Sequence, residues 1–242
     1  MGISSSVVLH FTKDKNALIG ILNNNFKYSY CKETIGFGDK EVVVYIPMVS
    51  FCDIPLSQIK NHINDYGSYG IALSKDWAKK QKLNPVLYIE KNSYLTASFR
   101  EMLINLREKG SITKNKDSNS ILNLLKYTKN YEGYNSYKED PNFIFFNERE
   151  WRISLENQEQ IDSIVVYDEK IENQKGILNK KIDQEKLLFT PNDIKYIIIN
   201  NDSEINGFIN DLRAAKEPFY SDEDIEKLTT RIITRDQIFD DM

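Results

Sequence analysis

The segments of this chain that can form strands or helices are short, and they follow no regular strand–helix–strand alternation. Alternating or β-branched apolar stretches predict strands at residues 7–11, 42–51, 69–73, 143–155, 161–167 and 194–200. Helical spacing of apolar residues predicts helices that include residues 13–24, 93–109, 202–215 and 222–229. This order favours an α+β fold over a doubly wound parallel sheet.

Local signals refine these boundaries. Pro47 interrupts the stretch at 42–51, which we interpret as two short strands or one strand with a bend. Ser74 and Ser221 are expected to cap the helices that follow them. The segment 130–141 is polar and rich in tyrosine, and we expect a loop that covers a surface there.

Length and composition bound the class of protein. The chain has 242 residues, of which 40% are hydrophobic and 28% are charged, as in ordinary globular proteins. This length leaves room for one large domain or two small ones, and we expect a single domain. The first thirty residues are charged and contain no long apolar run, so we expect neither a signal peptide nor a membrane helix. Cys31 and Cys52 form no CxxC motif, which suits a reducing, cytoplasmic location.

The charge is unevenly distributed. The net charge is −4, so the chain as a whole is not basic in the way that is typical of nucleic-acid-binding proteins. Residues 100–138 hold eight Lys/Arg against four Asp/Glu, whereas residues 202–242 hold five against eleven. The basic segment is either a solvated loop or a phosphate-binding segment. No GxGxxG or GxxxxGK[ST] loop occurs, and the two histidines and two cysteines are too scattered to indicate a metal site.

The most distinctive local pattern is the segment EREWR at residues 148–152. On a strand, side chains alternate between faces, so Glu148, Glu150 and Arg152 would share one face. Two nearby carboxylates raise each other's pKa, while the arginine lowers both. Such a group could orient a substrate hydroxyl or stabilise a developing cation, but a solvated Glu–Arg ion pair explains the same spacing.

Three further segments contain candidate residues. His10 on the first strand lies beside Thr12 and could bind a ligand hydroxyl, although a lone histidine is often structural. Tyr66 and Tyr69 flank Gly67, so either ring could be placed in a cleft, or the glycine could simply form a turn. Asp53 is explained equally well as a helix cap, and Cys52 lacks a histidine neighbour that would activate it.

These segments occur in an order that resembles the AbiGi family of bacterial abortive-infection proteins. The resemblance rests on LHFT at residues 9–12, IPMVSFCDIP at 46–55, YGSYGIAL at 66–73, Trp77, NPV at 84–86 and EREWR at 148–152. It spans about residues 5–200, and the segment at residues 50–55 is its most specific part. The family is described as the antitoxin side of a two-gene phage-defence system, so the resemblance implies a cognate toxin or another defence protein as partner.

The layout also resembles, more distantly, the ADP-ribosyltransferase fold, including DarT-like enzymes. That resemblance implies a split, mixed or antiparallel sheet with flanking helices, formed by residues 1–200, with residues 201–242 as an acidic helical extension packed on the same domain. It implies NAD as a substrate, a nucleic acid or a protein as the modified target, Glu150 as the catalytic carboxylate and Glu148 as its acceptor-orienting partner. The implied NAD-binding residues are His10, Thr12, Tyr66, Tyr69 and Arg152.

Cleavage of the nicotinamide–ribose bond would suit these residue types, because it creates an oxocarbenium-like centre that a carboxylate stabilises. Three hypotheses therefore follow from the sequence. The first is an NAD-dependent ADP-ribosyltransferase of phage defence. The second is a non-catalytic protein that restrains a toxin through residues 202–242 or the aromatic segment 131–137. The third is a nucleic-acid-binding module or nuclease that uses the basic segment and its tyrosines.

Overall fold

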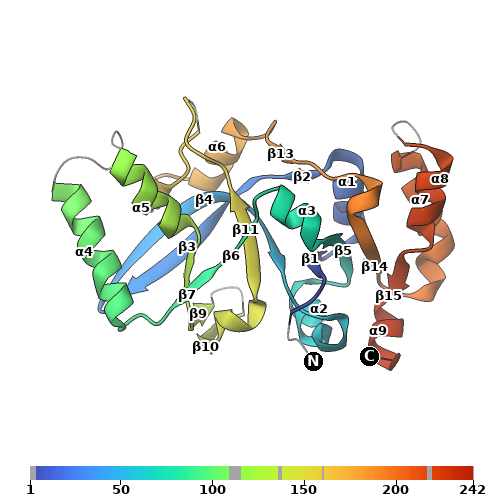
Figure 1. The fold of residues 1–242 in the computed structure, drawn as a ribbon, viewed down its shortest axis with the longest axis horizontal. Helices are drawn as coiled ribbons and strands as arrows, with labels where there is room; N and C mark the ends of the chain where they lie inside the picture. Colours follow the sequence, from blue (N-terminus) through green and yellow to red (C-terminus); the bar gives the residue numbers. More distant parts are fainter. Residues whose placement is uncertain (1–3, 109–115, 136–137, 160, 217–219, 242) are drawn as a thin grey trace. The chain divides into compact units, whose positions relative to one another are not determined.

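The computed structural model describes residues 4–108, 116–135, 138–159, 161–216 and 220–241 (Figure 1). Strands and helices are mixed along the chain, and both parallel and antiparallel strand pairs occur, which confirms the predicted α+β class. The residues group into two compact units. Unit 1 comprises Met1–Lys27, Ser50–Leu83 and Gln184–Met242, and unit 2 comprises Tyr28–Val49 and Asn84–Asp183.

The sheet of unit 1 brings together strands from both ends of the chain. Its order is β15 (Ile232–Thr234), β14 (Ile194–Ile199), β5 (Tyr69–Ser74) and β1 (Val7–Thr12). β14 and β15 run parallel, whereas β14–β5 and β5–β1 are antiparallel. The end of β4 (Lys40–Cys52) pairs with β1 through Leu9 and Cys52. A separate ladder joins β2 (Phe26–Lys27) to β13 (Lys186–Leu187).

Short helices cover this sheet. They are α1 (Lys15–Asn24), α2 (Lys60–Tyr66), α3 (Lys75–Lys80), α7 (Ile205–Lys216), α8 (Asp222–Thr229), α9 (Arg235–Asp241) and the 3-10 turns η1 (Leu56–Gln58), η3 (Pro191–Asp193) and η4 (Asp202–Glu204). The predicted caps are confirmed, because Ser74 accepts a hydrogen bond from Trp77 N and Ser221 accepts one from Asp224 N. Of the helices that the structure describes, none is both long and apolar enough to cross a membrane.

The core of unit 1 joins the two ends of the chain. Val7 and Leu9 of β1 pack with Ile198 of β14 and with Ile238 of α9 in one buried cluster. The segment predicted as an acidic extension falls in unit 1, and its described residues, 201–216 and 220–241, supply η4, α7, α8, β15 and α9 to that unit. Truncation of this segment would therefore uncover core side chains and not only remove charge.

Unit 2 is built around the long β3–β4 hairpin. Its elements are β3 (Ser29–Phe37), β6 (Asn84–Pro85), β7 (Leu87–Ile89), α4 (Tyr94–Glu108), α5 (Lys116–Lys126), β8 (Thr128–Asn130), β9 (Gly133–Asn135), β10 (Asp140–Phe143), η2 (Phe145–Glu148), β11 (Glu150–Ser154), β12 (Val165–Val166) and α6 (Gln174–Lys181). β12 pairs with β4, β11 pairs with β6, and β7 runs parallel to β8. Figure 1 shows α4 and α5, both green, beside the blue β3–β4 hairpin.

Pro47 does not divide β4, so the expectation of two short strands or a bend is replaced by one continuous strand. Tyr30 of β3 lies opposite Pro47 in an uninterrupted register. The Pro47 carbonyl accepts a hydrogen bond from Leu155 N at 3.1 Å, just past the end of β11. In a strand, the N–H and C=O of one residue point to the same side. The N–H that Pro47 lacks would therefore point toward the end of β11, where few ladder hydrogen bonds remain and its loss costs little.

The predicted strand at residues 143–155 is also corrected. β10 ends at Phe143, the 3-10 turn η2 follows, and β11 begins only at Glu150. Arg149 between them adopts a left-handed conformation with φ of 43°. This conformation breaks the alternation, so Glu148 lies on a turn and not on the strand of Glu150 and Arg152.

Other boundaries differ more modestly. The predicted loop at 130–141 contains the β9–β10 hairpin, while residues 136–137 lie outside the described part of the chain. The strand predicted at 161–167 is reduced to the two residues of β12. The helix predicted at 202–215 begins as η4 and continues as α7. The first two differences fall where strand pairing, and not apolar periodicity, decides the local structure.

Gly67 offers a test of the packing of unit 1. Its φ is 119°, and an added Cβ would lie 2.1 Å from Thr12 O and 2.6 Å from Lys13 Cα. We expect Gly67→Ala to lower the free energy of unfolding by about 2–4 kcal/mol through strain and backbone overlap. Gly20 in α1 has open space around its Cα, so Gly20→Ala should raise the free energy of unfolding by about 0.5–1 kcal/mol. Urea denaturation measures the free energy of unfolding of both variants, and equal changes in the two would contradict the expectation.

Candidate functional site

The predicted acidic residues of unit 2 meet in a buried cluster of charges around Arg152. The Arg152 side chain is fully buried and Glu150 is 7% exposed. Arg152 Nε donates to Glu150 Oε1 at 2.8 Å, and Arg152 Nη2 donates to Glu150 Oε2 at 2.7 Å. The pair is therefore bidentate, which is the strong geometry for an arginine and a carboxylate.

Residues from other elements complete this cluster. Lys129 of β8 donates to Glu148 Oε2 at 2.8 Å and to Glu150 Oε2 at 3.2 Å. Glu33 Oε1 of β3 lies 3.5 Å from Arg152 Nη2. We call Glu33, Lys129, Glu148, Glu150 and Arg152 the charged cluster. It contains three carboxylates and two cations held by four elements of unit 2.

The alternation of β11 explains why charges are buried here. Glu150, Arg152 and Ser154 form the buried face of the strand, while Trp151 and Ile153 are partly exposed. The prediction that Glu150 and Arg152 share a face is therefore confirmed, but that face points inward and not to solvent. Glu148 reaches the cluster from η2 and not from the strand.

Sequence reasoning did not identify Lys129 or Glu33 as members of the site. Both are far from EREWR in the chain, and neither belongs to a recognisable motif. Tyr88 was also missed, although its hydroxyl accepts a hydrogen bond from Glu150 N at 2.9 Å. The sequence shows only that a Glu and an Arg, if buried, need polar partners. It does not show which residues those partners are.

The electrostatics of the cluster keep Glu150 and Lys129 ionised. Burial alone would raise the pKa of Glu150, but the positive charges of Arg152 and Lys129 lower that pKa to about 2. Burial would lower the pKa of Lys129, but Glu150, Glu33 and Glu148 raise it well above the ordinary lysine value. Burial and the nearby Glu150 carboxylate raise the pKa of Tyr88, so this hydroxyl stays protonated.

The predicted NAD-binding residues His10 and Thr12 lie on β1 in unit 1. His10 Nδ1 is 2.8 Å from the Ser50 carbonyl, which can only accept, so Nδ1 carries the proton. The imidazole packs edge-on against Phe26 and Phe51. Burial lowers the pKa of His10, and the neutral ring therefore presents Nε2 as an acceptor. Thr12 Oγ1 donates to the Asp14 carbonyl at 3.1 Å.

The two candidate tyrosines have different surroundings. Tyr69 of β5 lies opposite Thr12 in the sheet, so Tyr69, Thr12 and His10 are brought together along neighbouring strands. Its hydroxyl donates to the Glu204 carboxylate, with 2.9 Å to Oε2, and burial with this contact raises the Tyr69 pKa to about 12. Tyr66 ends α2, where its ring packs against His62 with 4.4 Å between centroids.

Other predicted features have structural roles. Asp53 does not cap a helix, because it accepts hydrogen bonds from Ser4 Oγ and Ser5 N and forms an ion pair with Lys75 at 2.7 Å. Burial raises the pKa of Cys31 to about 11, so its thiol stays protonated. Within the described residues, no group of three or more His, Cys, Asp or Glu side chains could hold a metal ion.

Comparison with known proteins gives the family. Residues 24–200 match the family model described as "Putative abortive phage resistance protein AbiGi, antitoxin", which is more than half of the chain. The chain belongs to the AbiGi family. A relative from Lactococcus lactis subsp. cremoris, "Abortive phage resistance protein AbiGi", is 29% identical over 223 residues, which cover 81% of this chain and 89% of the relative. No solved structure matches.

The AbiGi resemblance predicted from the sequence is thus confirmed, whereas the resemblance to ADP-ribosyltransferases stays a prediction. The AbiGi match includes the whole charged cluster, Tyr66 and Tyr69. It begins after His10 and Thr12, which precede residue 24.

The charged cluster predicts a large effect of a small change. Glu150→Gln keeps the size of the side chain but leaves Arg152 buried without its bidentate carboxylate. We expect the free energy of unfolding to fall by about 3–5 kcal/mol. Glu226→Gln is the control, because Glu226 forms an exposed pair with Arg213 at 2.7 Å. Its effect should stay below about 1 kcal/mol in the same urea titrations.

The pH dependence of this difference tests its electrostatic origin. The pKa of Glu150 is lower in the folded chain than its ordinary value of 4.5, so its stabilisation is complete above about pH 4.5. It is lost as the pH falls from 4.5 toward about 2, where the folded carboxyl takes up a proton. The difference between wild type and Glu150→Gln should shrink over this window, and a constant difference would contradict the assignment.

Proposed function

We propose that this chain acts as the antitoxin of a two-gene abortive-infection system, and that it binds and restrains a cognate toxin. The observation that carries this proposal is the match of residues 24–200 to a family model described as an antitoxin. An antitoxin of this kind needs a surface for its partner, and it needs no catalytic centre. Unit 2 offers such a surface next to the charged cluster.

This surface is aromatic and exposed. Tyr131, Tyr134 and Phe146 are 41%, 62% and 47% exposed. Tyr131 stacks on Phe146 with 5.6 Å between ring centroids. We call these three exposed residues the aromatic surface. Aromatic residues are enriched at protein interfaces because they bury a large area with few rotatable bonds.

The charged cluster is connected to the aromatic surface through Tyr88. Tyr88 contacts Phe146 at 5.4 Å between ring centroids, and its hydroxyl binds the backbone of Glu150. The Lys129 ammonium lies 4.8 Å from the centre of the Phe145 ring while it also binds Glu148 and Glu150. Buried ion pairs thus hold the elements that present the rings, and a surface held in one conformation loses less entropy on binding.

The acidic helices of unit 1 offer a second contact surface, whose charge would suit a basic partner. Phe208 and Leu212 of α7 and Ile225 and Leu228 of α8 are buried, so these helices are anchored in unit 1. Because truncation would disrupt this core, charge substitution on exposed residues such as Glu223 is the appropriate test of that contact.

The aromatic surface gives the first test of the proposal. Tyr134→Ala and Phe146→Ala should each weaken binding of the purified cognate toxin by about 30-fold or more, because truncated aromatic anchors typically cost at least about 2 kcal/mol. Tyr94→Ala is the matched control, since Tyr94 is a 96% exposed tyrosine of α4 outside this surface. Titration calorimetry measures affinity, and growth rescue during toxin expression measures restraint.

The outcomes of this test are distinct. A wild-type chain that neither binds nor neutralises the toxin would overturn the antitoxin function itself. A chain that neutralises the toxin, but whose double variant Tyr134→Ala with Phe146→Ala binds as tightly as wild type, would overturn only the assignment of the surface.

A second candidate function is NAD-dependent ADP-ribosyl transfer to a protein or nucleic acid, on the ADP-ribosyltransferase-like split sheet that the resemblance implies. The ionised Glu150 carboxylate, with Glu148 bound to the same Lys129, is the observation that favours it. For that function the resemblance assigns the ribose contact to Glu150 and the orientation of the acceptor to Glu148. It assigns NAD binding to Arg152, which like these two lies in unit 2, and to His10, Thr12, Tyr66 and Tyr69, which lie in unit 1. Arg152 and Lys129 already donate three hydrogen bonds to the Glu150 carboxylate, which has about four acceptor sites, so about one site is left for a ribose hydroxyl. This occupancy ranks the second candidate behind the first.

Titration with NAD and with a non-hydrolysable NAD analogue tests the second candidate. Binding should be weakened at least about tenfold in His10→Ala, because a ligand hydroxyl would lose its Nε2 acceptor in a desolvated site. Thermal melting of the variant checks that its fold is retained. Absence of binding to wild type at millimolar ligand would rule out this function and leave the antitoxin proposal untouched.

A further inference from the structure

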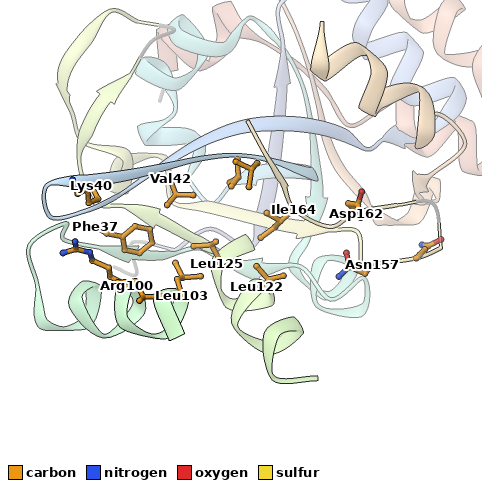
Figure 2. A pocket seen from close by; sticks show the side chains of 14 residues that line it. Phe37, Lys40, Val42, Arg100, Leu103, Leu122, Leu125, Asn157, Asp162 and Ile164 are labelled. Carbon is orange, nitrogen blue, oxygen red and sulfur yellow. The ribbon is translucent and has the colours of Figure 1, made fainter. Parts of the chain in front are cut away.

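Unit 2 contains a large cavity that neither proposed function uses. It lies between the β3–β4 hairpin, the helices α4 and α5, and the segment that leads from β11 to β12, and its volume is about 860 Å³ (Figure 2). Pockets that bind small molecules are typically about 300–1,000 Å³. The cavity is therefore large enough for a complete small ligand.

The middle of the cavity is apolar. Side chains from the hairpin, from both helices and from the segment before β12 point into it in Figure 2, namely Phe37, Val42, Leu103, Leu122, Leu125 and Ile164. Phe37 and Leu125 are buried members of the core cluster that Val42, Leu103 and Ile164 pack against. An alkyl chain laid along these residues would replace water at an apolar wall, which is favourable.

The two ends of the cavity are polar and differ in charge. Lys40 and Arg100 lie at one end, and Asn157 and Asp162 lie at the other (Figure 2). Asp39 Oδ2 lies 4.0 Å from Lys40 Nζ, and Asp39 Oδ1 lies 3.8 Å from Arg100 Nη1. One carboxylate is therefore shared by two cations, and neither distance is as short as a hydrogen bond. The Lys40 and Arg100 end is therefore left net positive.

An adjoining hollow enlarges the cationic end. It has a volume of about 380 Å³ and shares Phe37, Arg100 and Ile104 with the main cavity. Lys91 and Glu101 also line it. With Asp39 included, three cations face two carboxylates around this end, which favours an anionic group there.

We propose that this cavity binds a soluble amphiphile with an alkyl chain and a carboxylate head, one molecule per chain. The chain lies against the apolar middle, and the carboxylate lies between Lys40 and Arg100, where the planar guanidinium suits a carboxylate. The proposal goes beyond the antitoxin function and does not depend on it. It concerns an independent binding property of unit 2.

A series of linear alkyl carboxylates of increasing length tests the proposal by titration calorimetry below the critical micelle concentration. Affinity should rise by about fourfold per added methylene, as each buried CH₂ contributes about that factor, until the chain fills the cavity. Stoichiometry should be one. Alkyl trimethylammonium ions of equal length should bind at least about tenfold more weakly, because the head then meets Lys40 and Arg100.

Matched variants locate the site. Leu122→Trp places a large ring in the cavity and should reduce affinity by at least about tenfold, because the alkyl chain loses buried contacts. Leu124→Trp, on the exposed side of the same helix, is the control and should bind as wild type. Arg100→Glu changes an exposed residue and should weaken the carboxylates while favouring the ammonium ions. Thermal melting shows whether each variant folds.

Three results would overturn the proposal. These are no one-to-one binding by any member of the series, equal affinity for anionic and cationic heads, and unchanged binding in both Leu122→Trp and Arg100→Glu. Because Arg100 is exposed, its variant keeps the test decisive even if Leu122→Trp fails to fold.

Discussion

The buried ion pair between Arg152 and Glu150 is the constraint on which unit 2 depends. A guanidinium taken fully out of water is tolerated only when a carboxylate and further acceptors replace its hydration. Glu150 binds it through both oxygens, Glu33 approaches from β3, and the Lys126 carbonyl accepts from Nη1 at 3.2 Å. Hydrophobic burial alone would allow several alignments of these elements, whereas this geometry allows very few.

The same requirement explains how the charged cluster and the aromatic surface are linked. Lys129 satisfies Glu150 and Glu148 and also lies against Phe145, while Tyr88 joins the backbone of Glu150 to Phe146. Lys129 and Tyr88 thus have two roles. They satisfy the buried carboxylate and backbone of Glu150, and they also contact the phenylalanine rings beside the exposed face. A change in the cluster would therefore be transmitted to the rings through direct contacts.

The sequence allowed the class of fold, the caps at Ser74 and Ser221, and the common face of Glu150 and Arg152 to be predicted, because each depends on residues close in the chain. It did not allow Lys129 or Glu33 to be found, because their contacts depend on which strands become neighbours. It also misplaced the start of β11, since nothing local shows that Arg149 adopts a left-handed conformation. Pro47 misled for a related reason, because its effect depends on where the adjacent ladder ends.

These differences bear directly on function. As a pattern, EREWR suits a catalytic carboxylate pair, yet its most buried glutamate already has both oxygens engaged by cations. A carboxylate that already accepts three hydrogen bonds from Arg152 and Lys129 has little capacity left for a substrate hydroxyl. The same arrangement is well suited to holding a rigid interface, which a protein that restrains a partner requires. The hydrogen bonds to Glu150 therefore support the proposed antitoxin function more than the proposed catalysis, and the family to which the chain belongs is described as an antitoxin.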